Sequence, residues 1–208
     1  MLYQKIPGPF KRDPETNKID KTRWSSPELE ALADVPMWAF TEKIDGTNVR
    51  ILWDGFRITF GGRTDRAEMH GNLTACLNEL FKDKEPLFEE LFGESPAVLF
   101  GEGFGPGIQK NGARYGDKVQ FAMFDVAIDD YYLRPADARA IGTKLGVPQV
   151  PAVGPRYSDL SGAIWMIEQG FLSSYGDFEV EGVVGVTNMG LLDRRGHRLS
   201  VKIKGCDF

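Results

Sequence analysis

The part of the chain best suited to chemistry is the polar run TEKIDGTNVR at residues 41–50. It sets Lys43 between two carboxylates, Glu42 and Asp45, immediately before an alternating apolar segment. A lysine amine that has lost its proton is a nucleophile, and Gly46 would let a ligand approach the backbone. A short Lys-x-Asp-Gly sequence is equally consistent with a solvated turn, so the other polar clusters must decide between the two interpretations.

Further polar clusters lie near the ends of segments that are expected to be strands. In chain order they read GRT at 62–64, FGEG at 100–103, FAMFD at 121–125, EGVV at 181–184 and VKIK at 201–204. Lys202 and Lys204 are two residues apart and therefore share one face of a strand, although an edge strand protected by lysines has the same pattern. Glu181 and Glu102 each adjoin apolar strand sequence, where a carboxylate is costly unless a cation compensates it. The alternative for both is a surface acid at a strand end.

The clearest predicted element that could position these groups is a β-hairpin at residues 48–60. Residues 49–53 alternate between apolar and other side chains, Asp54-Gly55 supplies a two-residue turn, and residues 56–60 alternate back. A strand is also expected to end just before Lys43. The hairpin behind the lysine would give it a rigid support.

The remaining pattern predicts an α+β fold built on antiparallel sheet. Further strands are expected at 97–102, 119–128, 178–187 and 199–204. Helices are expected at 73–91 with a break at Pro86, at 135–145, and at 159–169 after a Ser158 cap. Because strands come in hairpins and runs, with helices gathered between them, strict βαβ alternation is excluded.

Composition and charge narrow the class of protein. No apolar run is long enough to span a bilayer, and the N-terminus lacks the apolar core of a signal peptide, which favours a cytoplasmic protein without a membrane partner. Cys76 and Cys206 are far apart, so neither a disulfide framework nor a CxxC metal site is expected. The net charge of −5 argues against indiscriminate nucleic-acid binding, but residues 194–204 carry five Lys or Arg and no acid. This run is either a polyanion-binding segment or a solvated turn.

Taken together and in this order, the clusters EKIDGTN, GGRTD, LFGEGFG, FAMFDV, EGVV and VKIK resemble those of the covalent nucleotidyltransferases, the superfamily of polynucleotide ligases and mRNA capping enzymes. They look most like the ATP-dependent RNA ligases of bacteriophage RNA-repair type. The resemblance runs from about Met37 to Lys204. It implies a nucleotidyltransferase (ATP-grasp-like ligase) domain of two antiparallel sheets with flanking helices and a nucleotide groove between them. Residues 1–208 would form one minimal domain without a C-terminal accessory domain.

The resemblance also implies catalytic roles. Lys43 would attack the α-phosphate of ATP and form a lysyl-AMP intermediate. Lys202 and Lys204, with a bound Mg²⁺ or Mn²⁺, would favour the neutral amine and stabilise charge on the phosphate. Glu181 would serve the lysine and the metal with its water ligands, and Arg63 would contact ribose and phosphate, with a part in transfer of AMP to RNA.

By the same resemblance, further residues would bind the nucleotide. Glu102 would hold the ribose hydroxyls, Phe124 would stack on adenine, and Glu42 would lie at the adenine end of the pocket. Phe121 and Phe124 should point to opposite faces of an extended strand, and without the family a core role for both is favoured. Asn48 would position the nucleotide or the RNA 5′-phosphate.

Polynucleotide contact is expected from Asp45, Asn48, Arg63, Arg194 and Arg195. Relatives usually carry a further C-terminal domain that helps engage the polynucleotide. Candidate substitutes for its contacts with the RNA backbone are the basic run from Arg194 and five residues near the N-terminus, Lys11, Arg12, Lys18, Lys21 and Arg23. The substrate would be RNA ends or a nicked RNA duplex, and the protein is expected to be a monomer. A DNA ligase or a GTP-dependent capping-type enzyme shares the lysine chemistry, and Asp45 is the form shared with DNA ligases. A non-catalytic nucleic-acid-binding relative would ordinarily have lost Lys43 or the Lys202/Lys204 pair.

Overall fold

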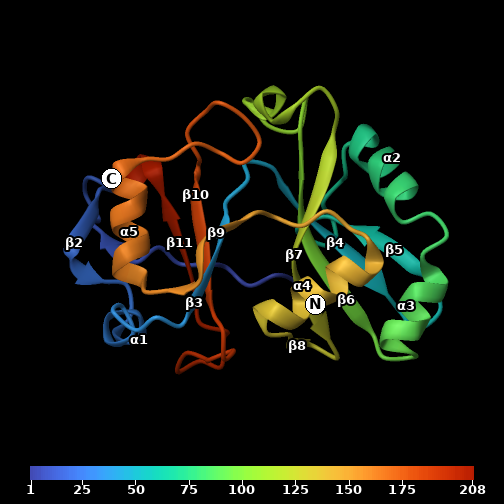
Figure 1. Ribbon diagram of the computed structural model, residues 1–208, viewed down its shortest axis with the longest axis horizontal. Helices are drawn as coiled ribbons and strands as arrows, with labels where there is room; N and C mark the ends of the chain where they lie inside the picture. The colour runs from blue at the N-terminus through green and yellow to red at the C-terminus, as the bar shows by residue number, and fades with distance from the viewer. The chain divides into compact units, whose positions relative to one another are not determined.

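The computed structural model (Figure 1) describes residues 1–155 and 158–208 with their side chains. The chain packs as two compact units, each with its own hydrophobic core. The first unit comprises residues 1–3 and 45–150, and the second comprises residues 4–44 and 151–208.

The first unit is built on a five-stranded antiparallel sheet with the strand order β5-β4-β6-β7-β8. Its strands are β4 (Thr47–Trp53), β5 (Ile58–Gly61), β6 (Ala97–Phe104), β7 (Gln120–Ile128) and β8 (Tyr131–Tyr132). Its helices are α2 (Gly71–Leu80), α3 (Glu85–Phe92), α4 (Pro135–Leu145) and the short 3₁₀ helix η1 (Gly112–Tyr115).

One face of this sheet forms the main core. Val49, Ile51 and Leu99 point from the strands into a cluster with apolar side chains of α2, α3 and α4. The opposite face carries a smaller apolar cluster around Val98 and Phe100. Because side chains alternate along a strand, Asn48 and Arg50 of β4 and Glu102 of β6 fall on this second face.

The second unit has a four-stranded antiparallel sheet with the order β11-β10-β3-β9, shown in Figure 1 with α5 beside it. Its elements are β3 (Trp38–Glu42), β9 (Ala152–Ser158), β10 (Gly182–Thr187), β11 (Ser200–Lys204), α5 (Leu160–Gln169), α1 (Pro27–Ala31), the hairpin β1 (Phe10–Arg12) and β2 (Ile19–Trp24), and the 3₁₀ helix η2 (Gly205–Asp207). Trp38, Val183 and Ile203 point from the sheet into a core that includes the apolar face of α5.

Several local expectations need correction. The hairpin turn has four residues rather than two, because Oδ1 of Asp54 accepts hydrogen bonds from the amides of Phe56 and Arg57 and β5 starts only at Ile58. The cap of α5 is Asp159, whose carboxylate accepts from the amide of Gly162, while Ser158 ends β9. The strand expected at 178–187 begins only at Gly182.

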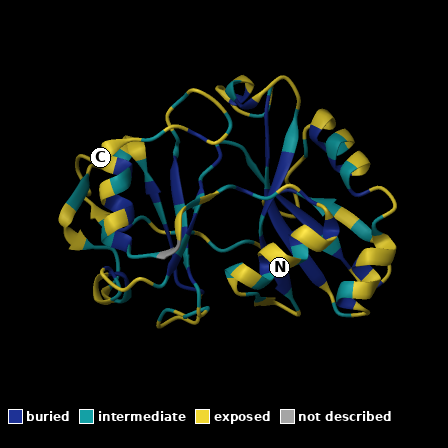
Figure 2. Cartoon of the chain, viewed as in Figure 1, coloured by how far each residue is buried: buried dark blue, intermediate teal, exposed yellow. Residues whose placement is uncertain are grey.

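Other expectations are confirmed. The helical pattern at 73–91 is two helices separated before Pro86, and α4 covers 135–145 as predicted. Figure 2 shows buried residues concentrated in the strands and exposed residues on the outer sides of the helices. Among the described residues, no helix has both the length and the apolar character needed to cross a membrane. The prediction of a single nucleotidyltransferase domain stays a prediction.

Candidate active site

Three charged side chains of the second unit form a compact cluster. Nζ of Lys43 lies 2.6 Å from Oε2 of Glu181, and Nζ of Lys204 lies 3.2 Å from Oε1 of the same carboxylate. All three side chains are between one fifth and one third exposed, so the cluster is open to a ligand. The carboxylate of Glu181 therefore holds the amines of Lys43 and Lys204 close enough together for both to contact one phosphate group.

The backbone around the cluster explains why these residues meet. The amide of Lys43 donates to the carbonyl of Gly182, which extends the β3–β10 ladder past the end of β3. The amide of Gly205 donates to the carbonyl of Glu181, which fixes the residue just before β10. Lys43, Glu181 and Lys204 thus lie at the same end of three adjacent strands.

Gly182 makes this close approach possible. Its φ is +155°, and a Cβ at this position would collide with the carbonyl oxygen of Ile203 and lie 2.9 Å from Cα of Lys204. A side chain there would push β10 away from β11. The glycine therefore keeps Glu181 next to Lys204.

Lys202 and Lys204 point to the same face of β11, as predicted. Val201 and Ile203, which alternate with them, are fully buried in the core of the second unit. Lys202 is paired with Val184 across the sheet, while its amide donates to the carbonyl of Pro7. The edge of β11 is therefore covered by the N-terminal segment, and its two lysines share the face that carries Lys43.

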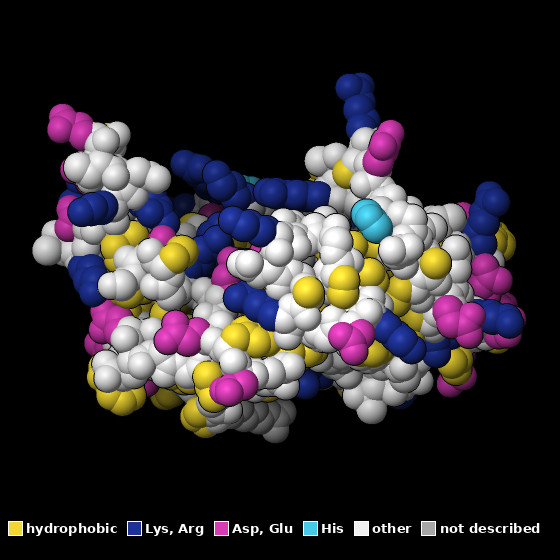
Figure 3. Space-filling model, turned by 90° about the horizontal axis from the view of Figure 1, so that it is seen from above, with side chains coloured by type: hydrophobic (Ala, Val, Ile, Leu, Met, Phe, Trp, Pro, Cys, Tyr) yellow, Lys and Arg dark blue, Asp and Glu magenta, His cyan; other side chains and the backbone are white. Residues whose placement is uncertain are grey.

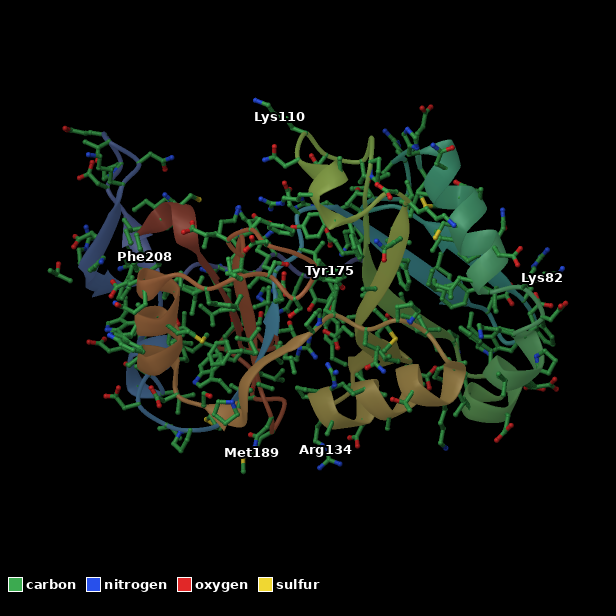
Figure 4. All side chains as sticks on the ribbon, turned by 45° about the horizontal axis from the view of Figure 1, so that its top comes forward. Lys82, Lys110, Arg134, Tyr175, Met189 and Phe208 are labelled. Atoms are coloured by element: carbon green, nitrogen blue, oxygen red, sulfur yellow. The ribbon has the colours of Figure 1, made fainter. Side chains whose placement is uncertain are left out.

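Glu42 lies on the opposite face of β3 from Lys43. Its side chain is 2% exposed, and its two oxygens accept hydrogen bonds from the hydroxyl of Ser173 and, at 2.9 Å, from the amide of Ser174. These serines belong to the loop of residues 170–181 between α5 and β10, where Figure 4 labels Tyr175. Glu42 thus anchors this loop, which ends at Glu181. Its role at the adenine end of a nucleotide pocket stays a prediction.

In the first unit, Asn48 and Glu102 lie opposite each other on neighbouring strands. They are paired in the β4–β6 register, on the face turned away from the main core. Oδ1 of Asn48 is buried and accepts no hydrogen bond from the described residues. An unsatisfied buried acceptor calls for a ligand or a water molecule, which fits the predicted binding role.

A β-bulge places Phe124 on the same face. The register of β6 with β7 slips between Phe100 and Gly101, so Phe124 is the extra residue of β7. Phe121 packs in the main core, whereas Phe124 is half-buried against the smaller cluster, 5.1 Å from the ring of Tyr3. The prediction that the two rings point to opposite faces is confirmed, and the adenine role of Phe124 stays a prediction.

Arg63 is exposed in the loop after β5, and the residue that fixes this loop was missed. Arg50, 3% exposed, donates from Nε to the carbonyl of Gly62 at 2.8 Å and from an Nη to Asp65 at 2.8 Å. An arginine on a hairpin strand at a position facing away from the core is the feature that could have revealed it. Arg50 thus holds the backbone of the residue before Arg63 and the side chain of Asp65, two residues after it.

Asp45 lies where the chain enters the first unit, and its backbone is held by a residue that the sequence did not single out. The amide of Asp45 donates to the hydroxyl oxygen of Tyr115 at 2.9 Å. Gln109 in turn donates to the carbonyl of Gly46 at 3.0 Å. These two contacts fix the backbone just after Lys43. Neither Tyr115 nor Gln109 belongs to a motif with a chemical pattern.

The basic run from Arg194 is only partly available. Arg194 pairs with Glu28 at 3.1 Å, and the amide of Arg195 donates to Asp193 in an exposed turn. Desolvation raises the pKa of the Asp193 carboxyl, but hydrogen bonds from the amides of His197 and Arg195 outweigh it and hold that pKa below its usual range. Arg194 and Arg195 lie outside the Lys43 cluster, and their contact with RNA stays a prediction. Acidic and basic side chains are both spread over the face shown in Figure 3.

The described residues contain no group of three or more metal-ligating side chains. Glu181 offers one carboxylate at the lysine cluster. Mg²⁺ and Mn²⁺ are commonly held by one or two carboxylates together with substrate phosphates and water. The donor set therefore fits a metal that arrives with a nucleotide, rather than a metal held by protein alone.

Comparison with known proteins places these residues in context. The model of the RNA ligase family matches residues 36–204. The comparison with curated protein sequences finds no match.

Solved structures of an RNA ligase from Naegleria gruberi share the fold. The structure with PPi has 20% identity and a TM-score of 0.66, and the match covers 98% of this chain and 59% of that chain. A mutant with ATP and Mn has 18% identity and a TM-score of 0.64, covering 98% and 60%. A mutant with AMP and Mn has 17% identity and a TM-score of 0.65, covering 86% and 52%. This chain therefore spans little more than half the length of these structures.

Proposed function

The chain belongs to the RNA ligase family, and we propose that it joins RNA 5′-phosphate and 3′-hydroxyl ends in an ATP-dependent reaction. The observation that supports this most directly is the cluster of Lys43, Glu181 and Lys204 on adjacent strands. It supplies a nucleophile, a group that orients it, and a cation for the phosphate. Lys202 adds a second cation on the same face.

In the first proposed step, the Lys43 amine attacks the α-phosphorus of ATP. An N–P bond forms, the bond from the α-phosphorus to the bridging oxygen breaks, and pyrophosphate leaves with the electron pair. Glu181, which accepts a hydrogen bond from Nζ, would orient the amine and take its proton. Lys202 and Lys204 stabilise negative charge on the α-phosphate as the transition state forms.

Two further phosphoryl transfers complete the proposed reaction. An oxygen of the RNA 5′-phosphate attacks the phosphorus of lysyl-AMP, which frees Lys43 and leaves an adenylylated 5′ end. The 3′-hydroxyl of the other end then attacks the 5′-phosphate, and AMP departs. Each step needs an in-line nucleophile and fixed cations, so positioning supplies much of the rate.

We assign nucleotide binding to the residues that the family resemblance singled out. Glu102 would hold the ribose hydroxyls, Phe124 would stack on adenine, and Asn48 and Arg63 would contact ribose or phosphate. Glu42 would reach the adenine end of the nucleotide, and Asp45, Arg194 and Arg195 would contact the polynucleotide. The buried, unsatisfied oxygen of Asn48 is the structural feature that supports the set best.

A divalent ion, Mg²⁺ or Mn²⁺, would supply charge neutralisation at the phosphates, with Glu181 as its protein ligand. The related Naegleria gruberi ligase has been solved with ATP and Mn, which supports ATP and Mn²⁺ as the pair to test first. The protein residues named above would bind and orient the nucleotide. We propose that the protein acts as a monomer in the cytoplasm, in RNA repair of the bacteriophage type.

The direct test is covalent labelling. The protein is mixed with α-labelled ATP and Mn²⁺ or Mg²⁺, denatured, and examined for label on the polypeptide. We expect label on the wild type and on Lys18→Ala, an exposed lysine in the N-terminal region, and none on Lys43→Ala. Label that persists in Lys43→Ala would overturn the proposal.

The substrate is tested separately. Sealing of nicked RNA duplex, open RNA ends and nicked DNA is compared, with ATP or GTP as cofactor. We expect sealing of RNA with ATP. Preferential sealing of nicked DNA would assign a DNA ligase, and labelling with GTP alone would assign a capping-type enzyme.

A further inference from the structure

The first three residues of the chain pack against the second face of the five-stranded sheet, opposite the main core. They belong to the first unit, whereas the residues that follow them belong to the second. Figure 1 shows the N-terminus beside β6 and β8. The carbonyl of Met1 accepts a hydrogen bond from an Nη of Arg50 at 3.3 Å, which ties the start of the segment to β4. A chain terminus is ordered where such contacts hold it.

The ring of Tyr3 lies inside an aromatic cluster on that face. Its centroid is 4.9 Å from that of Phe100, 5.1 Å from that of Phe124 and 5.6 Å from that of Tyr132. The last two rings meet it at 71° and 86°, close to the edge-to-face geometry that aromatic pairs favour. Tyr3 therefore contacts β6, β7 and β8 with one side chain.

The hydroxyl of Tyr3 is held as well. It donates to Oδ2 of Asp125 at 2.9 Å, and Asp125 is 3% exposed. The other oxygen of this carboxylate accepts from the amide of Val126 at 3.1 Å. Because a buried carboxylate is costly without donors, this hydrogen bond fixes the position of the tyrosine. The ring and the hydroxyl of Tyr3 thus contact two consecutive residues of β7, Phe124 and Asp125.

Phe124 is a residue that needs support from outside its own sheet. The register of β6 with β7 slips at the bulge, which leaves Phe124 outside the regular pairing of the two strands. Its side chain is only half-buried, so core packing alone does not determine the orientation of the ring. Tyr3 supplies a ring contact that the strand pairing does not.

The orientation of this ring matters for base stacking. A purine stacks on an aromatic side chain only when the ring presents a face to it. If the ring is free to move, ordering it when the ligand binds costs affinity. A ring that is already held by a neighbour avoids this cost.

We propose that Tyr3 is a positioning residue for nucleotide binding, because it holds the ring of Phe124 in the orientation on which adenine stacks. This inference rests on the proposed function, in which Phe124 stacks on the adenine of ATP. In this role Tyr3 takes no part in the chemistry at Lys43. Its loss should therefore raise the KM for ATP and leave the maximal rate of labelling unchanged.

The first test follows labelling of Lys43 as the ATP concentration is varied. Tyr3→Ala should raise the KM for ATP about three- to tenfold, the scale of ordering one side chain on binding, with the maximal rate within about twofold of the wild type. Tyr3→Phe keeps the ring and should keep the wild-type KM, while the lost hydroxyl lowers stability to urea. Tyr131→Ala is the matched control, since Tyr131 is 79% exposed on β8. A wild-type KM in Tyr3→Ala would overturn the proposal.

A double-mutant cycle separates positioning from general stabilisation. If Tyr3 acts through Phe124, Tyr3→Ala should raise the KM for ATP no further in a protein that already carries Phe124→Ala. Two effects that multiply would show that the residues act independently, and the proposal would fail. All variants are compared at a temperature at which circular dichroism shows them folded. If Tyr3→Ala does not fold, Tyr3→Leu, which fills part of the space without a ring, replaces it in the same cycle.

Direct binding distinguishes this inference from the proposed function. Binding of labelled ATP with Mn²⁺ is measured by equilibrium dialysis on Lys43→Ala, with and without Tyr3→Ala. We expect Tyr3→Ala to weaken binding about three- to tenfold. If the wild type takes no label while Tyr3→Ala still weakens ATP binding, the ligase function fails and the role of Tyr3 stands. Equal affinities with and without Tyr3→Ala, or no binding by either protein, would overturn the role of Tyr3 whatever labelling shows.

Discussion

Nζ of Lys43 and Oε2 of Glu181 are 2.6 Å apart, although the two residues are 138 positions apart in the sequence. The other oxygen of Glu181 meets Lys204. Because one carboxylate orients both amines, its replacement by an amide of the same shape should remove the charge that orients them while leaving the volume of the cluster almost unchanged.

We therefore expect Glu181→Gln to slow labelling of Lys43 by roughly 10²-fold or more, the scale typical of losing an orienting or proton-accepting group. The measurement is the rate at which label from ATP appears on the denatured protein. Glu179→Gln, an exposed glutamate two residues earlier, is the matched control and should label at the wild-type rate. A wild-type rate for Glu181→Gln would remove this residue from the mechanism.

Gly182→Ala should lower both stability and activity. The new Cβ would meet the carbonyl of Ile203, and the φ of +155° disfavours any side chain. We expect a loss of about 2 kcal/mol or more in the free energy of unfolding, measured by urea denaturation, with slower labelling of Lys43. Gly190→Ala is the control: Gly190 has φ +66° and no atom within 4 Å of the position that a Cβ would take, so this variant reports the backbone cost alone. Equal losses for the two variants would show that the approach of β10 to β11 tolerates a side chain.

Glu42→Gln tests the anchor of the 170–181 loop. An amide in place of the carboxylate can satisfy only one of the two donors from Ser173 and Ser174, and the residue is fully enclosed. The free energy of unfolding should fall by about 1–3 kcal/mol. Exposed Glu30→Gln should leave it unchanged. If Glu42→Gln is as stable as the wild type but binds ATP more weakly, the carboxylate serves the nucleotide rather than the loop.

Arg50→Lys should weaken the loop that carries Arg63. A lysine cannot reproduce the planar set of donors to the carbonyl of Gly62 and to Asp65, so we expect about 1–3 kcal/mol of destabilisation. Transfer of AMP from Lys43 to RNA should slow in parallel with Arg63→Ala. Asp65→Ala removes the exposed partner only, since Asp65 is 81% exposed, and should cost about 1 kcal/mol at most. An intact transfer rate in Arg50→Lys would argue that the loop needs no such support.

Phe121→Ala and Phe124→Ala should separate packing from nucleotide binding. Phe121 is 2% exposed in the main core, so its truncation should cost about 3–5 kcal/mol in the free energy of unfolding. Phe124 is half-buried and should cost less while raising the KM for ATP about tenfold through loss of stacking. A KM for ATP that is unchanged in Phe124→Ala would return this ring to a structural role.

The regular elements could be predicted because they depend on short-range pattern. The alternation around Val49 and Trp53 identified β4, and Pro135 marked the start of α4. The prediction of a two-residue turn was wrong because the carboxylate of Asp54 accepts hydrogen bonds from the two amides after Gly55, which lengthens the loop. The hairpin β1–β2 was not predicted, since its strands are short and largely exposed and so lack an alternating apolar pattern.

The lysine cluster was foreseeable only through the order of motifs. Nothing local to Lys43 indicates that Glu181 will lie beside it, because that contact depends on the pairing of β3 with β10. Tyr115 was missed for the same reason, because it acts on a segment 70 positions away in the sequence through geometry that composition does not record. The bulge that turns Phe124 to the face of Glu102 is likewise a property of register, which only the paired strands define.

Glu42 and Lys43 are neighbours in the chain, yet one carboxylate is sealed among the serines of a loop and the adjacent amine faces the open cluster. The two side chains differ in this way because consecutive side chains along β3 point to opposite faces of the sheet. Insertion or deletion of a single residue between Trp38 and Glu42 would turn each of the two to the other face of the sheet, with the carboxylate on the face of the lysines and the amine on the core face. This strand should therefore tolerate many changes of side-chain size but not the insertion or deletion of an odd number of residues. The number of residues in β3 decides which charged side chain faces the lysine cluster.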